Sequence, residues 1–176
     1  MADGGAASQS ELDLAFRGAM RRLAATVTVV TSADHTRRHG MTATSVTSLS
    51  MAPPSLLVCL NQRTLLRDIM LGARRFCVNV LHRDQADLSA AFAGALDAEA
   101  RFGVGSWRRD EDGLPYLDGA QAVLVCQRTA ALPFGTHTIF VGEVVRASHQ
   151  KDVAPLIYEN AAYCRTTPFA PLSTAA

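Results

Sequence analysis

Long hydrophobic runs are missing from this chain of 176 residues. No apolar stretch approaches the ~20 residues that a helix needs to cross a bilayer, so we expect no membrane association. The first ten residues lack the basic start and the apolar centre of a secretory signal, and we expect residues 1–11 to form a disordered tail. The formal net charge is only +1, which provides no overall basic field for a nucleic acid partner.

Closely paired cysteines are also missing. No Cys-x-x-Cys pair or Cys/His cluster has the spacing of a zinc site, and the five histidines are scattered, so we expect no metal. Three of the four cysteines lie in apolar runs, where a free thiol behaves as a small hydrophobe. This usage favours a reducing, cytoplasmic location. The four cysteines are Cys59, Cys77, Cys126 and Cys164.

A Gly-x-Gly-x-x-Gly turn opening a helix is absent, which argues against a Rossmann dinucleotide site. Internal repeats and an inter-domain linker are absent too, so we assign residues 12–168 to one domain, followed by a C-terminal tail at 169–176. Several short strands and few helices predict a mostly β fold, an antiparallel barrel with peripheral helices. We expect helices over 12–23, 65–71 and 84–95, strands over 25–31, 42–51, 56–60, 76–81, 123–132 and 138–148, a strand or turn over 153–158, and irregular structure over 97–112.

Hydroxyl side chains are concentrated at the start of segment 40–60. Thr and Val favour strands, and alternate residues of a strand share one face, yet neither face here is apolar enough to serve only the core. One interpretation is a solvated edge strand. The other is a binding strand whose hydroxyls and backbone N–H groups hold a phosphate or a ring rich in hydrogen-bonding atoms. The hydroxyl residues are Thr42, Thr44, Ser45, Thr47, Ser48 and Ser50.

Four motifs recur here in a fixed order. Segment 40–60 is followed by Phe-Cys-Val-Asn-Val-Leu at 76–81, Asp-Gln at 84–85 and Gly-Thr-His-Thr-Ile-Phe-Val-Gly at 135–142. This series resembles the short-chain flavin reductases, the reductase components of two-component flavin monooxygenases, over residues 14–165. The resemblance implies an FMN-binding split barrel, usually a homodimer. It also implies that NADH or NADPH reduces FMN or FAD, and that the reduced flavin passes to a separate oxygenase.

The resemblance further implies a set of flavin-binding residues. The strand segment would contact the isoalloxazine edge and ribityl chain, and the helix beginning after Thr64 would hold the flavin phosphate at its N-terminus. Family members often have Ser where Arg63 stands, which makes Thr64 the expected hydroxyl ligand. The full set is Thr44, Ser45, Val46, Thr47, Asn61, Thr64, Asn79, Arg101, Phe102, Tyr163 and Arg165.

His137 is the catalytic candidate. A lone His in a Gly-x-His segment is more often structural, but in the family this His lies beside the flavin, where the nicotinamide docks. Hydride transfer from nicotinamide to flavin demands no nucleophile or general base, so we expect His137 to orient the nicotinamide. Two alternatives remain open: a non-catalytic flavin-binding protein, and a reductase that passes electrons from bound flavin to a corrinoid or metal chelate. The motifs argue against a pyridoxamine-phosphate-oxidase-like role. FMN and FAD are not distinguished, nor are NADH and NADPH.

Overall fold

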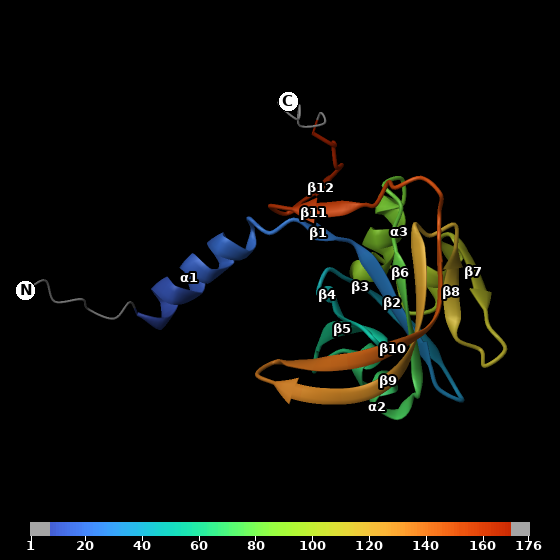
Figure 1. Cartoon of the computed structure of the whole chain (residues 1–176). Helices are drawn as coiled ribbons and strands as arrows, with labels where there is room; N and C mark the ends of the chain where they lie inside the picture. Colours follow the sequence, from blue (N-terminus) through green and yellow to red (C-terminus); the bar gives the residue numbers. More distant parts are fainter. Residues whose placement is uncertain (1–7, 170–176) are drawn as a thin grey trace, which may run out of the picture.

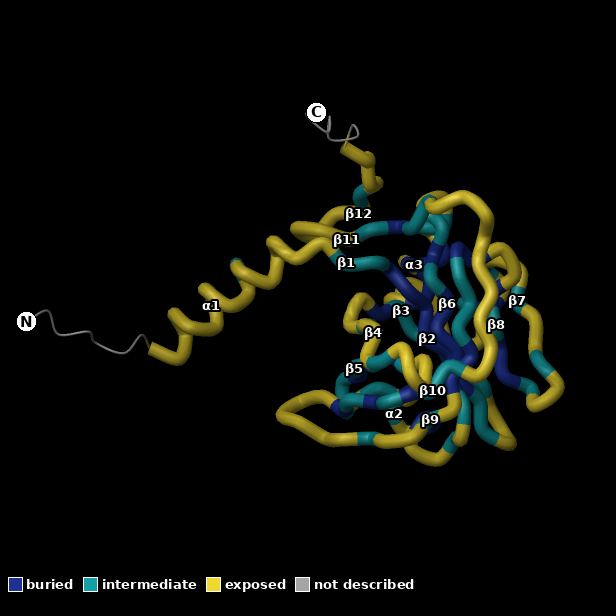
Figure 2. Tube along the Cα trace, in the orientation of Figure 1, coloured by how far each residue is buried: buried dark blue, intermediate teal, exposed yellow. Residues whose placement is uncertain are grey.

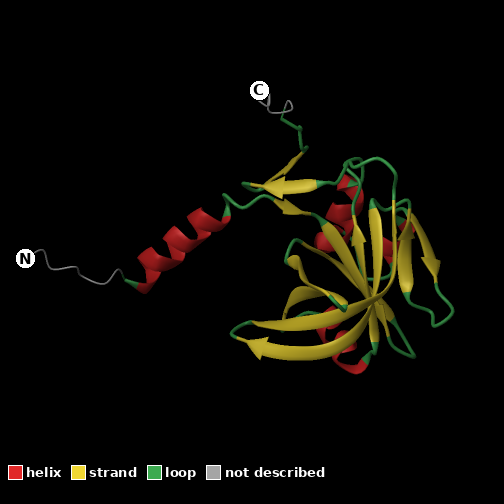
Figure 3. Ribbon diagram, in the orientation of Figure 1, coloured by secondary structure: helices red, strands yellow, loops and turns green. Residues whose placement is uncertain are grey.

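A seven-stranded antiparallel sheet forms the body of the protein in the computed structural model, which describes residues 8–169 (Figures 1 and 3). The sheet order is β3-β2-β6-β9-β10-β5-β4, and every neighbouring pair is antiparallel. The predicted mostly β fold with peripheral helices is therefore confirmed. The strands are β2 (Thr28–Ala33), β3 (Arg38–Ala43), β4 (Val46–Met51), β5 (Pro54–Asn61), β6 (Arg75–Val80), β9 (Ala122–Phe134) and β10 (His137–His149).

The two edge strands of this sheet, β3 and β4, follow one another directly in the chain. The Thr44–Ser45 step joins them, so the sheet must curl until its edges meet, giving an open barrel. The prediction of one strand over 42–51 is wrong. Ala43 accepts a 2.7 Å hydrogen bond from the Thr28 hydroxyl on β2, whereas the Ser45 carbonyl accepts a 3.0 Å bond from the Cys59 N–H on β5. The chain therefore changes partner strands at this step.

The barrel core is apolar and closely packed. Phe76 and Phe140 are fully buried, and they pack with Val58 and Leu60 from β5. Gly142 on β10 is required by this packing, because a Cβ atom there would overlap the Phe76 ring. A second cluster contains the edge-to-face pair Phe92 and Phe102, and both rings also contact Trp107.

Segment 97–112, predicted as irregular, contains a strand. β7 begins at Ser106 and pairs with β8 in a hairpin beside the main sheet, because the half-buried Trp107 anchors it to the aromatic cluster. A three-stranded sheet above the barrel adds β12, which the sequence did not predict. The three-stranded sheet consists of β1 (Ala25–Thr26), β11 (Ile157–Glu159) and β12 (Ala162–Cys164). The hairpin consists of β7 (Ser106–Arg109) and β8 (Pro115–Asp118).

Short helices surround the barrel. The α2 helix begins after Thr64, whose side chain accepts the Arg67 N–H at 3.4 Å, as the sequence predicts. The predicted helix over 84–95 consists of α3 and a π-helical turn, η1, which is kinked at Gly94, where φ is +114°. These elements are α2 (Leu65–Gly72), α3 (Ala86–Ala90), η1 (Ala91–Ala95) and a 3₁₀ turn, η2 (Ala100–Gly103).

The first helix, α1 (Gln9–Met20), projects from the body (Figure 1). It begins three residues before the predicted start because Ser8 and Glu11 form a capping box at its N-terminus. Residues 9–11 of the expected tail at 1–11 are therefore helical, and residues 1–7 and 170–176 lie outside the described part of the chain. None of the residues of this helix is buried (Figure 2). Among the described residues, no helix is long and apolar enough to span a membrane.

Candidate functional site

The Thr44–Ser45 step forms the seam of the open barrel. On either side of it, β3 and β4 are edge strands, and an edge strand leaves alternate backbone N–H and C=O groups unpaired on its outer side. Both residues are exposed. The Ser45 hydroxyl donates to the Cys59 carbonyl at 2.7 Å, which holds the seam against β5. The seam thus offers a fixed backbone with free hydrogen-bonding groups.

Two hollows open at the seam, and Thr44 lines both. The larger has a volume of about 620 Å³ and lies between the end of α1, the seam and the β11–β12 turn. The smaller has about 300 Å³ and is lined by Phe92 and Tyr163 as well as by Thr44. Pockets of several hundred Å³ with an apolar lining and few polar groups are typical of small-molecule sites. The structure thus brings Thr44, Ser45 and Tyr163 together.

A third hollow, of about 590 Å³, lies on the other side of β4. Its lining is mostly apolar and includes Val46 and Thr47 from the predicted set, together with Leu56 and Val144. The four predicted strand residues therefore do not face a single cavity. Thr44 and Ser45 open to the seam hollows, and Val46 and Thr47 open to this groove.

A second group of predicted residues gathers where β5 and β10 meet. His137 and Asn61 are direct cross-strand partners. The side-chain amide of Gln62 donates to the His137 carbonyl at 3.0 Å and to the Gly135 carbonyl at 3.3 Å, which ties the β9–β10 turn to the end of β5. The His137 ring is exposed, and its Nδ1 is 2.9 Å from the Thr136 hydroxyl.

The N-terminus of α2 belongs to this second group. The Thr64 hydroxyl donates to the Asn61 carbonyl at 2.8 Å, and the Arg63 N–H donates to the Asn61 side chain at 3.0 Å. Arg67 lies in the first turn of the helix and donates from Nε to the Thr138 hydroxyl at 3.3 Å. This corner combines the N-terminus of a helix with the Arg67 guanidinium, which is also paired with Asp68 at 3.1 Å, and such groups suit a phosphate.

Asn79 does not join either group. It is fully buried, and its amide donates to the Val29 carbonyl at 2.9 Å and accepts the Leu117 N–H at 2.8 Å. The side chain therefore completes hydrogen bonds of the core, between β2 and β8. The sequence indicated that a buried Asn needs partners, and those partners are protein groups.

Arg101, Phe102 and Arg165 also lie apart from the seam. Phe102 is 6% exposed within the aromatic cluster. The Arg101 guanidinium donates to the carbonyls of Gly40 and Leu96, at 2.9 Å each, so it joins β3 to the segment after η1. Arg165 is exposed in the chain after β12. Their assignment to the flavin site stays a prediction.

Sequence reasoning missed Ser89, which connects the smaller seam hollow to the body. This buried residue on α3 accepts the Tyr163 hydroxyl at 2.9 Å through its side chain, and its carbonyl accepts the Thr42 hydroxyl at 2.6 Å. The contact fixes β12 beside the seam. A lone Ser inside a helical segment carries no sequence pattern that would single it out.

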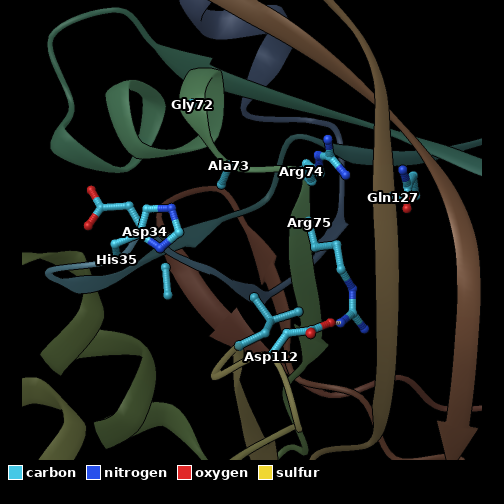
Figure 4. A pocket seen from close by; sticks show the side chains of 10 residues that line it. Asp34, His35, Gly72, Ala73, Arg74, Arg75, Asp112 and Gln127 are labelled. Atoms are coloured by element: carbon cyan, nitrogen blue, oxygen red, sulfur yellow. Dashed lines mark hydrogen bonds and ion pairs between the residues drawn. The ribbon is translucent and has the colours of Figure 1, made fainter.

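Another cavity, of about 710 Å³, lies at a different place, under the β2–β3 turn and the end of α2 (Figure 4). It is lined by His35, Arg74 and Arg75, and Arg75 is already paired with Asp112. None of the predicted site residues lines this cavity. Size alone therefore does not make this cavity the functional site.

Two buried thiols are inert. Burial raises the pKa of Cys77 far above its usual value and raises that of Cys126 to about 12, so both stay protonated at neutral pH. The geometry therefore provides no thiolate nucleophile in the core.

The groups at the seam are hydroxyls, backbone groups and apolar walls, and groups of this kind can bind and orient a ring system.

The open antiparallel barrel carries its candidate binding groups at the seam and at the start of α2, an arrangement that suits a flat ring system with a phosphate. Comparison with known families agrees. Residues 20–167 match the model of the flavin reductase like domain, and the chain belongs to this family. The resemblance deduced from the ordered motifs is thus confirmed.

Individual relatives agree with this assignment. The reductase component of an FADH2-dependent resorcinol hydroxylase from Rhizobium sp. (strain MTP-10005) is 52% identical over 155 residues, 87% of each chain. The 4-hydroxyphenylacetate 3-monooxygenase reductase component of Salmonella typhimurium is 37% identical over 84% of this chain and 88% of its own. Among solved structures, the NADH:FAD oxidoreductase of Streptomyces globisporus superposes with a TM-score of 0.83 at 28% identity, covering 97% of this chain and 96% of that one.

Proposed function

We propose that this protein is an NAD(P)H-dependent flavin reductase that reduces FMN or FAD and supplies the reduced flavin to a separate oxygenase component. The observation that carries the proposal is the seam of the barrel. Thr44 and Ser45 border two ring-sized hollows there, in a chain whose family is that of the flavin reductases.

The seam and the α2 corner fit a flavin. Free backbone groups beside Thr44 and Ser45 suit the oxygen and nitrogen atoms of the isoalloxazine edge, and the apolar walls of the hollows suit its ring faces. The α2 N-terminus with Thr64 suits the phosphate. When bound, the flavin accepts a hydride from the nicotinamide. The task of the protein is to bind both rings, keep them in contact and exclude water between them.

His137 is the residue that we assign to orientation of the nicotinamide. It is exposed, it lies on the rigid pairing of β10 with β5, and its ring is held by the neighbouring Thr136 hydroxyl. Hydrogen bonding to the donor ring is the role that this setting supports.

The known relatives support the proposed cofactors and the proposed partner. One FMN reductase (NADH), from Pseudomonas syringae, is 40% identical over 82% of each chain, and the Streptomyces globisporus enzyme was solved with NAD and FAD fragments. The reductase components named for resorcinol hydroxylase and 4-hydroxyphenylacetate monooxygenase belong to systems with separate oxygenases. An oxygenase that receives reduced flavin is the partner that we propose here.

Steady-state oxidation of NADH and NADPH, each with FMN or FAD, tests the reaction. We expect turnover that depends on added flavin. Folded protein that binds flavin but fails with all four cofactor pairs would be a non-catalytic flavin-binding protein. Turnover that appears only when a corrinoid or ferric chelate is added would establish the other alternative.

We also propose a homodimer. Alternate residues of β5 and β10 form the outer face of the sheet, and this face is apolar although its residues are only partly buried. Leu132 and Phe134 extend it on β9, with 60% and 78% of their surface exposed. A two-fold partner would cover such a face. The half-buried residues are Leu57, Cys59, Ile139 and Val141.

Light scattering at micromolar concentration should give twice the chain mass, and a monomer would contradict the proposal.

The location that we propose is the cytoplasm. All four cysteines are free, including the half-buried Cys59 and Cys164, and free thiols persist in a reducing compartment. Thiol titration of unfolded protein taken directly from the native cell should find four reactive groups.

A further inference from the structure

The smaller seam hollow is built from separate elements, and one buried serine is bonded to two of them. Ser89 on α3 is fully buried. Its carbonyl accepts the Thr42 hydroxyl of β3 at 2.6 Å, and its side-chain oxygen accepts the Tyr163 hydroxyl of β12 at 2.9 Å. All three residues line the hollow of about 300 Å³. A single residue of α3 therefore connects the strand that leads into the seam with the last strand of the chain.

The strand β12 has little else to hold it in place. Among the described strands it pairs with β11 alone, over three residues, and the turn between the two consists of Asn160 and Ala161, both with positive φ. A two-stranded hairpin is marginally stable in water by itself. The contact with Ser89 ties the Tyr163 side chain of this hairpin to the barrel body.

The Tyr163 hydroxyl is engaged, whereas its ring is open. Tyr163 has 43% of its surface exposed, and its ring stands edge-on to the Tyr158 ring of β11, with the centroids 5.6 Å apart. Both rings line the smaller hollow. Aromatic side chains make edge and offset contacts with other ring systems. Because its O–H donates to Ser89, Tyr163 offers the hollow an aromatic surface of fixed orientation.

We propose that Ser89 is a positioning residue of the flavin site, which holds the Tyr163 ring as an aromatic wall against the isoalloxazine ring. The inference rests on the proposed function and adds a residue to the same site. Ser89 acts through Tyr163 and does not touch the flavin. Thr42 precedes the Thr44–Ser45 step by two residues, so the second bond of Ser89 holds the seam side of the same hollow.

The benefit of this arrangement is preorganisation. A side chain that is already ordered costs less to bind against than one that the ligand must immobilise. Without its bond to Ser89, the Tyr163 ring would move among several rotamers on a short hairpin. We therefore expect weaker binding of the flavin ring in a protein that still folds.

Variants of the bonded pair test the proposal. Ser89→Ala and Tyr163→Phe each remove the bond from one side, and each should raise the flavin dissociation constant about 2- to 12-fold, the effect of one net hydrogen bond. The double variant should bind flavin no more weakly than either single variant, because both substitutions remove the same contact. Tyr163→Leu removes the ring as well and should weaken binding further than Tyr163→Phe.

Three flavins separate the ring from the phosphate. Riboflavin, FMN and FAD share the isoalloxazine ring, but riboflavin carries no phosphate. Titration by fluorescence quenching should give the same fold-change for Ser89→Ala with all three. A change confined to FMN and FAD, or no binding of riboflavin by the wild type, would overturn the placement of the ring against Tyr163.

Matched controls separate positioning from general loss of stability. Ser32 is also fully buried, and its hydroxyl donates to the Arg75 carbonyl at 2.8 Å, away from both seam hollows. Ser32→Ala should lower the melting temperature as Ser89→Ala does and should leave flavin affinity unchanged. Tyr158→Phe leaves the Tyr163–Ser89 bond in place and should also bind flavin as the wild type does.

The failures of this inference and of the proposed function are distinct. Wild-type flavin affinity in both Ser89→Ala and Tyr163→Phe, additive losses in the double variant, or an equal loss in Ser32→Ala would make Ser89 a purely structural residue and overturn the inference. Wild-type protein that binds flavin but does not oxidise NADH or NADPH would refute the reductase and leave the role of Ser89 in binding intact.

Discussion

His137 and Asn61 face one another across β10 and β5, and the Asn61 carbonyl also holds the Thr64 hydroxyl at the start of α2. The paired ends of β5 and β10 thus join His137, assigned to the nicotinamide, with the helix α2, assigned to the phosphate. Both functions depend on the same two strands, and variants can separate them.

His137→Ala should lower kcat/KM for the nicotinamide about five- to 150-fold, the effect of losing a hydrogen bond of about 1–3 kcal/mol, with flavin affinity nearly unchanged. His149→Ala is the matched control, because His149 is also exposed, ends the same strand and has its Nδ1 beside a backbone oxygen of the next residue. Stopped-flow flavin reduction measures the effect. A lower melting temperature with normal hydride transfer would make His137 a structural residue.

Thr44→Ala should raise the flavin dissociation constant about 2- to 12-fold, because one net hydrogen bond contributes about 0.5–1.5 kcal/mol. Fluorescence quenching of the flavin measures the affinity. Ser106→Ala removes an exposed hydroxyl from β7 and should leave it unchanged. Equal affinities for wild type and Thr44→Ala would move the ring site away from the seam.

Thr64→Ala should lower stability by about 1 kcal/mol, since the side chain caps α2, and should weaken flavin binding by a similar amount if the hydroxyl meets the phosphate. Thr64→Ser keeps the hydroxyl and should restore both. Urea unfolding and flavin titration on one preparation distinguish the two roles. Loss of stability with unchanged affinity would confine Thr64 to capping.

Asn79→Ala should destabilise the fold by about 1–3 kcal/mol for each buried group that it leaves without a partner, namely the Leu117 N–H and the Val29 carbonyl. Flavin affinity of the folded fraction should not change. Gln150→Ala, at an exposed amide, is the control for stability. A selective loss of flavin binding in a stable Asn79→Ala protein would return Asn79 to the site.

The pKa of His39 lies below its ordinary value of 6.5, because burial disfavours the charged ring and the positive charges of Arg101 and Arg37 add to the effect. Between the lowered pKa of folded His39 and the ordinary value of 6.5, the unfolded chain therefore binds a proton at His39 that the folded chain does not bind. The contribution of neutral His39 to the free energy of unfolding is fully present above about pH 6.5. It is lost as the pH falls through the lower pKa of His39 in the folded chain. Chemical unfolding between pH 7.5 and 5 should show a shallower loss for His39→Gln than for wild type. His35→Gln, at an exposed ring, should follow the wild type.

Periodicity and end signals predicted most of the secondary structure. Thr64 and the apolar run after it mark α2 correctly, because a cap is a local interaction between neighbouring residues. The strand over 42–51 was predicted as continuous since nothing local marks a break between Ala43 and Val46. The break arises from long-range pairing, in which each half joins a different strand.

The candidate site was predictable to the extent that its residues adjoin one another in sequence or belong to paired strands. Asn61 and Thr64 are adjacent along the chain, and His137 reaches them through sheet register. Arg101 could not be placed in this way, because its contacts with backbone carbonyls depend on how η1 and β3 pack in three dimensions.

The Thr44–Ser45 step also has a consequence for folding. The strands β3 and β4 that it joins are neighbours in the chain but stand at opposite edges of the sheet. Within the sheet, β9 and β10 lie between β5 and β6, and both begin more than 60 residues after the end of β5. The seam hollows therefore take shape only after these distant pairings have closed. Flavin can bind tightly only to a chain that has completed its sheet, so cofactor uptake should be the last event of folding and the first lost on unfolding.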